Sequence, residues 1–287
     1  MMKKQNLKIL VPIDFKEASI NGLMTAIEIA KMKSGELTLF HVKSNVQHMI
    51  NRGYSGFGEH SEAYKLGEEE LSDENHKTKM ELESLARNYG VGKVPVSTYV
   101  GAGYYKDQLE KYLSNHQVDL LVMGTSGQNS LAELFTGTKA EQSIRLSKVP
   151  VLAVKKFHKP EELKNLLLGI ELREYDQEII NAIKQIPDYL EMNVFIVYVK
   201  HSKFEESEEV LGFLENFTKK HDFKNYKLEV LPEGDTQKKL EDFAQKNDID
   251  IIATITKGER GIFKLIYGSH TEGLLDKSTE SVLTIKR

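Results

Sequence analysis

Three glycines and a threonine that follow a buried strand are the best candidates for chemistry in this chain. Residues 120–123 are apolar and predict the strand. Gly124 comes directly after it, Gly127 follows after two more residues, and Gly137 and Thr138 follow after a further nine. Glycines in this position let backbone N–H groups approach a ligand without interference from a Cβ atom. The N-terminus of the next helix adds partial positive charge. The pattern therefore predicts a binding site for a polyphosphate.

The better-known phosphate and nucleophile motifs do not explain these residues. A P-loop needs Lys before Thr, whereas residues 137–139 have Thr before Lys, and Ala132 stands in place of the first glycine. Residues 101–103 begin like a dinucleotide-binding fingerprint, but Lys106 replaces its third glycine. Residues 124–127 are one residue too short for a nucleophile elbow.

A second corner of the predicted sheet brings an acidic residue toward the same place. Residues 7–13 predict a strand, residues 15–31 have apolar residues at helical spacing, and residues 37–42 predict another strand. In open parallel sheets, ligands bind beyond the carboxyl ends of the strands where the direction of the connections reverses. We therefore expect Asp14 at the crevice, where it either meets the ligand or caps the following helix.

The chain contains an internal duplication. The strand–helix–strand unit of residues 7–42 recurs at residues 163–199 with an offset of 157. The later parts of both halves match at an offset of 131, which aligns Asp119 with Asp250. The change of offset places 26 extra residues in the first half, within residues 44–79.

Length and pattern together predict two tandem α/β domains. The 287 residues exceed what one compact core needs. Buried strands alternate with amphipathic helices, which is typical of a parallel sheet covered on both faces. We expect two Rossmann-like domains, at residues 1–157 and 161–287, each with a five-stranded parallel sheet.

Composition excludes several classes of protein. The 39 basic and 43 acidic residues give a net charge of −4, which offers no case for binding nucleic acid or an anionic membrane. The absence of Cys excludes disulfides and thiolate sites and fits the cytoplasm, where we expect the protein. No apolar run approaches the roughly 20 residues of a membrane span. Residues 1–160 carry +3 and the remainder −7, which favours the first half for an anion site.

The insertion within residues 44–79 has no assigned role. Its glycines and the acidic run at residues 68–70 fit either a functional lid or a solvated loop that leads into an extended helix. His48, His60 and His76 also fall here, but no HExxH or CxxC spacing accompanies them. We therefore do not expect a metal site.

The complete glycine pattern resembles that of a known family. The spacing Gly-x2-Gly-x9-Gly-Thr, closed by a strand at residues 149–152 and combined with residues 10–15 and the His41-Val42 pair, resembles the universal stress protein family. Two such halves in one chain resemble its tandem members. The resemblance implies the adenine nucleotide alpha hydrolase-like variant of the Rossmann fold, with bound ATP and Mg²⁺ on its phosphates.

The resemblance also implies which residues hold the nucleotide. Asp14 would face the ribose or a phosphate-bound metal, Val42 and Met123 would border the adenine, and backbone amides would hold the ribose and phosphates. The full set is Pro12, Ile13, Asp14, Val42, Met123, Gly124, Gly127, Gln128, Gly137, Thr138 and Lys139. Two alternatives stay open: Val42 and Met123 are plain core residues, and the glycines serve turns alone.

The second half departs from the pattern at three positions. Ile255 replaces the first glycine, Glu171 replaces Asp14, and Gly169 replaces Pro12. A branched Ile adds bulk where backbone would have to meet a ligand. We therefore expect one competent nucleotide site, in the first half, and a degenerate second domain.

A degenerate second domain still has a use as a packing partner. In single-domain relatives two copies pair through their last strands, so the resemblance implies that residues 149–154 and 281–285 pair within this chain. A further dimer of two chains is left open.

Three functions compete at this point. The first is an ATP-binding regulatory protein of the stress response. The second is an enzyme that slowly hydrolyses ATP, for which Asp14, Lys139 and His41 are the candidates, although no spacing singles out a base. The third is a scaffold or chaperone-like protein that needs no nucleotide and docks a partner through residues 44–79.

Overall fold

The protein is built on one continuous sheet with helices packed against it. The computed structural model describes residues 6–43, 62–125, 139–256 and 281–286. Its strands are β1 (Lys8–Pro12), β2 (Glu36–Lys43), β3 (Val96–Ala102), β4 (Leu120–Gly124), β5 (Val151–Val154), β6 (Asn165–Gly169), β7 (Asn193–Val199), β8 (Tyr226–Leu231), β9 (Ile251–Thr256) and β10 (Ser281–Lys286). Its helices are α1 (Glu17–Lys33), α3 (Glu62–Asn88), α4 (Tyr105–Asn115), α5 (Lys139–Leu146), α6 (Gln177–Leu190), α7 (Ser207–Lys220), α8 (Thr236–Lys246) and the 3₁₀ turn η2 (Pro160–Glu162).

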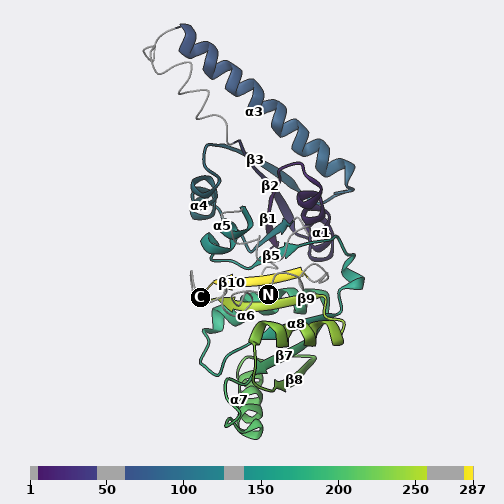
Figure 1. The fold of residues 1–287 in the computed structure, drawn as a ribbon. Helices are drawn as coiled ribbons and strands as arrows, with labels where there is room; N and C mark the ends of the chain where they lie inside the picture. The colour runs from purple at the N-terminus through teal and green to yellow at the C-terminus, as the bar shows by residue number, and fades with distance from the viewer. Residues whose placement is uncertain (1–5, 44–61, 126–138, 257–280, 287) are drawn as a thin grey trace.

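The sheet consists of two parallel halves joined at their last strands. Its ten strands run in the order β3-β2-β1-β4-β5-β10-β9-β6-β7-β8 (Figure 1). Pairing within each half is parallel, whereas β5 and β10 pair antiparallel through Leu152 and Leu283. The predicted α/β fold with two five-stranded parallel sheets is confirmed, as is the pairing of the last strands. Because β5 and β10 are antiparallel, the carboxyl ends of the two half-sheets point in opposite directions.

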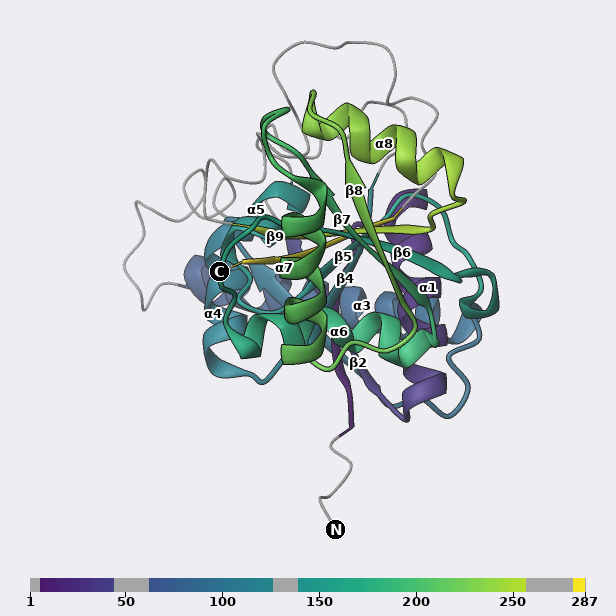
Figure 2. The same ribbon diagram turned by 90° about the horizontal axis from the view of Figure 1, so that it is seen from below.

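Helices cover both faces of the sheet, as the apolar strands require. One face packs against α1, α3, α6 and α7, and Ile27, Leu82, Ile183 and Leu214 lie in that single core. The opposite face carries α4 and α5 in the first half and α8 in the second. Figure 2 shows α8 and α6 on opposite sides of the strands. The strands are buried on both faces, which explains why they are continuous apolar runs in the sequence.

The aligned aspartates Asp119 and Asp250 have a structural role. Asp119 Oδ2 accepts a hydrogen bond of 2.9 Å from the Lys8 backbone N–H at the start of β1. Asp250 Oδ2 accepts bonds of 2.8 and 2.9 Å from the backbone N–H groups of Lys164 and Asn165 at the start of β6. Each carboxylate therefore ties together two neighbouring strands at the amino edge of its half-sheet, and this part of the repeat maintains the fold.

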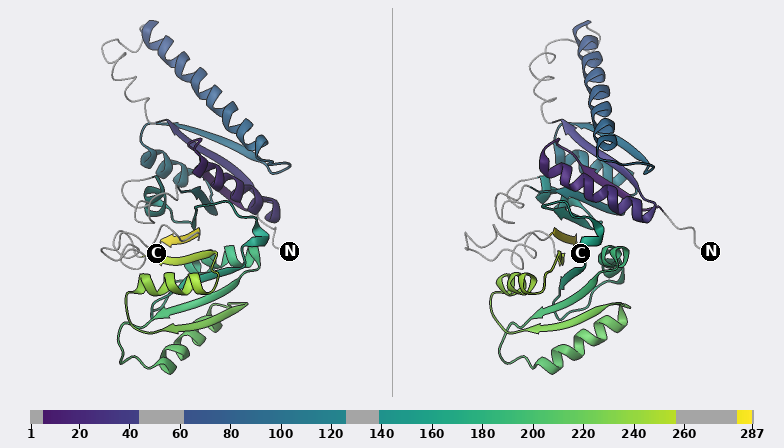
Figure 3. Two further views of the ribbon diagram at one scale, coloured as in Figure 1. Left: turned by 45° about the vertical axis from the view of Figure 1, so that its right-hand side comes forward. Right: turned by 90° about the vertical axis from the view of Figure 1, so that its right-hand side faces the viewer.

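The helix that overlaps the insertion is longer than its counterpart in the second half. Helix α3 has 27 residues and α7 has 14. Leu82 and Ala86 pack α3 onto the core, and Figure 3 shows its N-terminal part extending past the sheet. The extended helix of one of the two alternatives is therefore present. Residues 44–61, on which the choice between a lid and a loop depends, lie outside the described part of the chain. None of the described helices is long and apolar enough to cross a membrane.

Candidate functional site

A cavity of about 440 Å³ lies at the carboxyl ends of β1 and β4. The chain leaves β1 toward β2 and leaves β4 toward β5, so the connections diverge here, as the sheet order requires of a ligand-binding crevice. Seven of the predicted site residues line it: Pro12, Ile13, Asp14, Val42, Met123, Gly124 and Lys139. The other four, Gly127, Gln128, Gly137 and Thr138, lie outside the described residues.

A hydrogen-bonded turn holds Asp14 at the mouth of this cavity. Asp14 Oδ1 accepts a bond of 3.1 Å from the Lys16 backbone N–H. The Asp14 backbone N–H donates to Ser19 Oγ at 3.3 Å, and Ser19 Oγ donates to the Lys16 carbonyl at 2.9 Å. Asp14 therefore supports the turn that leads into α1 and also lines the cavity. The alternative that Asp14 caps α1 is wrong, because Lys16 occupies the N-cap position and no side chain caps the helix there.

Packing against α1 requires a glycine at position 124, which the sequence did not reveal. A Cβ atom on Gly124 would lie 1.5 Å from the Ala18 carbonyl oxygen in α1, and a Cβ on Gly22 would lie 2.5 Å from the Gly124 nitrogen. The two glycines let the backbones of α1 and β4 touch. This contact places Ala18 and Ser19 at the cavity. The original explanation, that Gly124 makes room for a ligand, is therefore incomplete, because the glycine is already required by packing.

The entrance of the cavity has a surplus of positive charge. Lys16 and Lys139 line it together with the single carboxylate of Asp14. Lys139 is the first residue of α5, so backbone N–H groups at a helix N-terminus add to the positive potential. The Lys139 Nζ also lies 5.6 Å from the centre of the Tyr105 ring. An anionic group fits this end of the cavity.

The opposite side of the cavity is apolar. Phe40, Val42 and Met123 are almost completely buried and come from β2 and β4. The Phe40 ring meets the Tyr105 ring edge-on at 5.8 Å. Tyr105 forms a 2.7 Å hydrogen bond with Ser143 Oγ, and burial raises the pKa of its phenol, so it remains a neutral wall. An aromatic base fits between such side chains.

His41 faces away from this cavity. Its neighbours Phe40 and Val42 point into it, and alternation along β2 sends His41 to the other face of the sheet. The ring Nδ1 lies 2.8 Å from the Ile13 carbonyl and donates to it, because a carbonyl can only accept. Burial lowers the pKa of His41, although the bond to Ile13 opposes this shift. Of the three residues considered for ATP turnover, Asp14 and Lys139 line the cavity and His41 does not.

Sequence reasoning missed half of the lining. The further residues are Lys16, Ala18, Ser19, Phe40, Tyr105, Thr125 and Ala140. In the sequence, a glycine within the predicted helix at residues 15–31, Gly22, could have indicated that this helix approaches the sheet closely. The described residues contain no group of three His, Asp or Glu side chains that could hold a metal ion.

At the equivalent corner of the second half, three side chains contact one another. Glu171 Oε2 lies 3.5 Å from Arg173 Nε, and the Arg173 guanidinium lies 4.7 Å from the centre of the Tyr175 ring. Tyr175 Oη accepts a 2.8 Å bond from the Glu171 backbone N–H. Ile255 is the register equivalent of Gly124, because Ile255 pairs with Ile285 on the last strand as Gly124 pairs with Val154. The Ile255 side chain is buried in the core.

Known proteins share both the sequence pattern and the fold. A universal stress protein of Methanocaldococcus jannaschii is 28% identical over 149 residues, which cover 52% of this chain and 82% of that protein. One from Bacillus subtilis is 26% identical over 149 residues, which cover 52% of this chain and 98% of that protein.

Solved structures match nearly the whole chain. A universal stress protein from Archaeoglobus fulgidus superposes with a TM-score of 0.68 at 17% identity, over 99% of this chain and 97% of that one. The cytoplasmic domain of a prokaryotic cation chloride cotransporter superposes with a TM-score of 0.52 at 12% identity, over 98% and 95%. At such identities the likeness concerns the fold. The model of the universal stress protein family matches twice, at residues 6–155 and 179–286, and the chain therefore belongs to this family as a tandem member.

Proposed function

We propose that this protein binds ATP in the cavity of its first half and acts in the cytoplasm as a nucleotide-dependent regulator of the stress response. The observation that carries the proposal is the division of that cavity into a cationic entrance and an apolar wall. Its volume of about 440 Å³ falls within the range of small-molecule sites, roughly 300–1,000 Å³.

The two ends of the cavity match the two ends of the nucleotide. Phe40, Val42 and Met123 would contact the adenine, which needs an apolar and aromatic environment. Lys16 and Lys139 would bind the phosphates, with help from the backbone at the start of α5. This agrees with the roles that the family resemblance implies for Val42, Met123 and Lys139.

Asp14 is the carboxylate available for the ribose or for Mg²⁺. One protein carboxylate together with phosphate oxygens is a common way to hold this ion, which keeps several of its waters. Its Oδ1 already accepts from the Lys16 backbone, so a ligand at this residue would add to an existing turn. The metal would therefore arrive with the nucleotide.

The test is to identify nucleotide in the purified protein and then to titrate it. The protein is denatured and the released small molecules are separated, and nucleotide-free protein is titrated with Mg-ATP in a calorimeter. We expect adenine nucleotide in the first measurement and one site per chain in the second. If adenine nucleotide is absent and added Mg-ATP gives no heat of binding, the proposal is wrong. That result would favour the scaffold function, which needs no nucleotide.

A further inference from the structure

A second cavity, of about 360 Å³, lies at the amino edge of the first half-sheet. Lys8 and Glu36 come from the starts of β1 and β2, Tyr112 comes from the last turn of α4, and His116 directly follows that helix. The ATP cavity lies at the carboxyl ends of the same strands, so the two cavities occupy opposite edges. None of the predicted nucleotide residues lines the second one.

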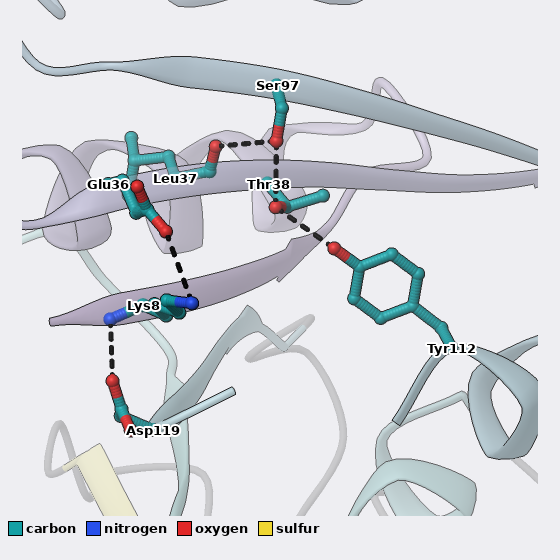
Figure 4. Close-up of polar contacts among 7 residues, drawn as sticks. All are labelled: Lys8, Glu36, Leu37, Thr38, Ser97, Tyr112 and Asp119. Atoms are coloured by element: carbon teal, nitrogen blue, oxygen red, sulfur yellow. Dashed lines mark hydrogen bonds and ion pairs between the residues drawn. The ribbon is translucent and has the colours of Figure 1, made fainter. Parts of the chain in front are cut away.

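Three hydroxyl groups form a directed chain along this cavity. Tyr112 Oη donates to Thr38 Oγ1 at 3.1 Å, Thr38 Oγ1 lies 2.9 Å from Ser97 Oγ, and Ser97 Oγ donates to the Leu37 carbonyl at 3.3 Å (Figure 4). When the Ser97 hydrogen lies on the Leu37 carbonyl, Thr38 donates to Ser97. In that arrangement each hydroxyl has used its donor and keeps at least one acceptor lone pair. The cavity offers acceptors to a ligand that carries donors.

His116 adds a flat surface and one more acceptor. Its ring stacks on Tyr112 with the centres 4.1 Å apart and the planes at 8°. His116 Nδ1 lies 3.1 Å from the Tyr112 carbonyl and donates to it, which leaves Nε2 of the neutral ring as an acceptor. A ligand that has both hydroxyl groups and a C–H face can use the two features together.

The charges of the lining cancel. Lys8 Nζ lies 3.9 Å from Glu36 Oε1, and these are the two charged residues among those that line the cavity. A phosphate or a polyamine therefore finds no net attraction here, in contrast to the ATP cavity with its two lysines. The electrostatics favour an uncharged ligand.

The second half shows that the fold does not require this cavity. By register, Phe195 and Lys227 occupy the positions of Thr38 and Ser97, and by the 131-residue offset Phe243 occupies that of Tyr112. Phe195 is buried, its ring lies 5.7 Å from Phe243, and Lys227 Nζ lies 5.1 Å from its centre. In the second half, phenylalanine rings therefore occupy the positions at which the first half has the hydroxyl groups of Thr38 and Tyr112.

We propose that the amino-edge cavity binds an uncharged polyhydroxylated molecule, a polyol or a sugar of one or two rings. Hydroxyl hydrogens of the ligand would meet Tyr112, Thr38 and Ser97, and its C–H face would lie on the His116 ring. The size agrees, because the volume of about 360 Å³ is at the small end of ligand sites. This site is independent of ATP.

The test uses saturation-transfer NMR with full-length protein and named probes. The neutral probes are glucose, myo-inositol and trehalose, and the charged probe observed directly is spermidine. Inorganic phosphate has no C–H hydrogens, so it is tested by whether it displaces a bound neutral probe. We expect at least one neutral probe to bind, and Thr38→Phe, which introduces the residue of the second half, to abolish its signal. Tyr112→Phe should weaken binding by about 3- to 10-fold, the effect of one hydrogen bond.

Tyr99→Phe is the matched control, because the Tyr99 hydroxyl bonds to Gln108 Oε1 at 2.8 Å and does not line the cavity. It should bind the neutral probe as the unaltered protein does. Circular dichroism checks that the Thr38→Phe variant is folded. If that variant is unfolded, the affinity of Tyr112→Phe for the neutral probe tests the proposal instead. The proposal is overturned if no neutral probe binds, if Tyr112→Phe binds as tightly as Tyr99→Phe, or if phosphate or spermidine takes the site instead.

Discussion

The two halves of the sheet have the same topology, but they differ in one residue at the carboxyl end of a central strand, which is glycine in the first half and isoleucine in the second. At the end of β4, Gly124 lets α1 touch the strand, whereas at the end of β9 the buried side chain of Ile255 occupies the equivalent register position. The N-terminal turn of α1 therefore reaches the crevice. The comparison teaches that a ligand-binding crevice in this fold depends on backbone-to-backbone packing beside it as much as on the residues that line it.

The two corners also use their charges differently. In the first half Lys16 lines an open cavity beside Asp14. In the second half Arg173, at the position of Lys16, forms an ion pair with Glu171 and lies over Tyr175. The charges of the second corner thus interact with each other, which supports our proposal that nucleotide binds in the first half.

The largest effect is expected when the isoleucine of the second half is introduced at position 124 of the first half. In Gly124→Ile, the new Cβ would begin 1.5 Å from the Ala18 carbonyl oxygen, so α1 must move. We expect the free energy of unfolding in urea to fall by about 3 kcal/mol or more. ATP binding should be lost as well.

The control for this variant is Gly212→Ile in α7. A Cβ at Gly212 meets nothing within 4 Å, so the stability should change by about 0.5 kcal/mol or less. Equal losses in the two variants would contradict the packing explanation of Gly124.

The next largest effect concerns the cationic entrance. Lys139→Met removes one charge from the proposed phosphate end and keeps the length of the side chain. ATP affinity in calorimetry should fall about 10- to 100-fold, as expected for one charge-assisted hydrogen bond. Lys148→Met, at an exposed position after α5, is the control and should leave the affinity unchanged. A loss of affinity in both variants would point to net charge rather than to the site.

Asp14 and Glu171 allow the corners to be compared by isosteric changes. Asp14→Asn keeps the Oδ1 acceptor of the Lys16 backbone and removes the charge, whereas Asp14→Ala removes both. We expect about 1 kcal/mol of destabilisation in Asp14→Ala, little in Asp14→Asn, and weaker Mg-ATP binding in both. Glu171→Gln should not affect ATP binding. The proposed ligand role of Asp14 does not survive if Asp14→Asn binds Mg-ATP normally.

The smallest effect is a dependence of stability on pH, which each half should show through one histidine. Burial lowers the pKa of His41 in the first half and of His221 in the second, from an ordinary value of 6.5. The unfolded chain takes up these protons first as the pH falls, so stability should decline from pH 6.5 through the lowered pKa values. Urea midpoints at pH 7.5 and 5.5 should differ less in His41→Gln and His221→Gln than in the unaltered protein. The exposed His201→Gln variant should retain the full difference.

Much of the fold could be predicted because its signals are local. The apolar runs predicted strands such as residues 7–13 and 37–42, which lie where β1 and β2 are found. The repeat then required the second half to resemble the first. Buried parallel strands and amphipathic helices have different periods in the sequence, so their type can be recognised without knowing what they contact. The domain limits 1–157 and 161–287 stay predictions.

The candidate site was predicted only in part. The sequence by itself determined the glycine pattern, the corner at Asp14 and the departures of the second half, because each of these belongs to one short segment. Only the tertiary structure decided that Phe40 and Tyr105 share a wall and that Gly124 is required by α1. Such facts depend on the register between strands and on how closely a helix approaches a sheet, and both are set by packing between segments far apart in the chain.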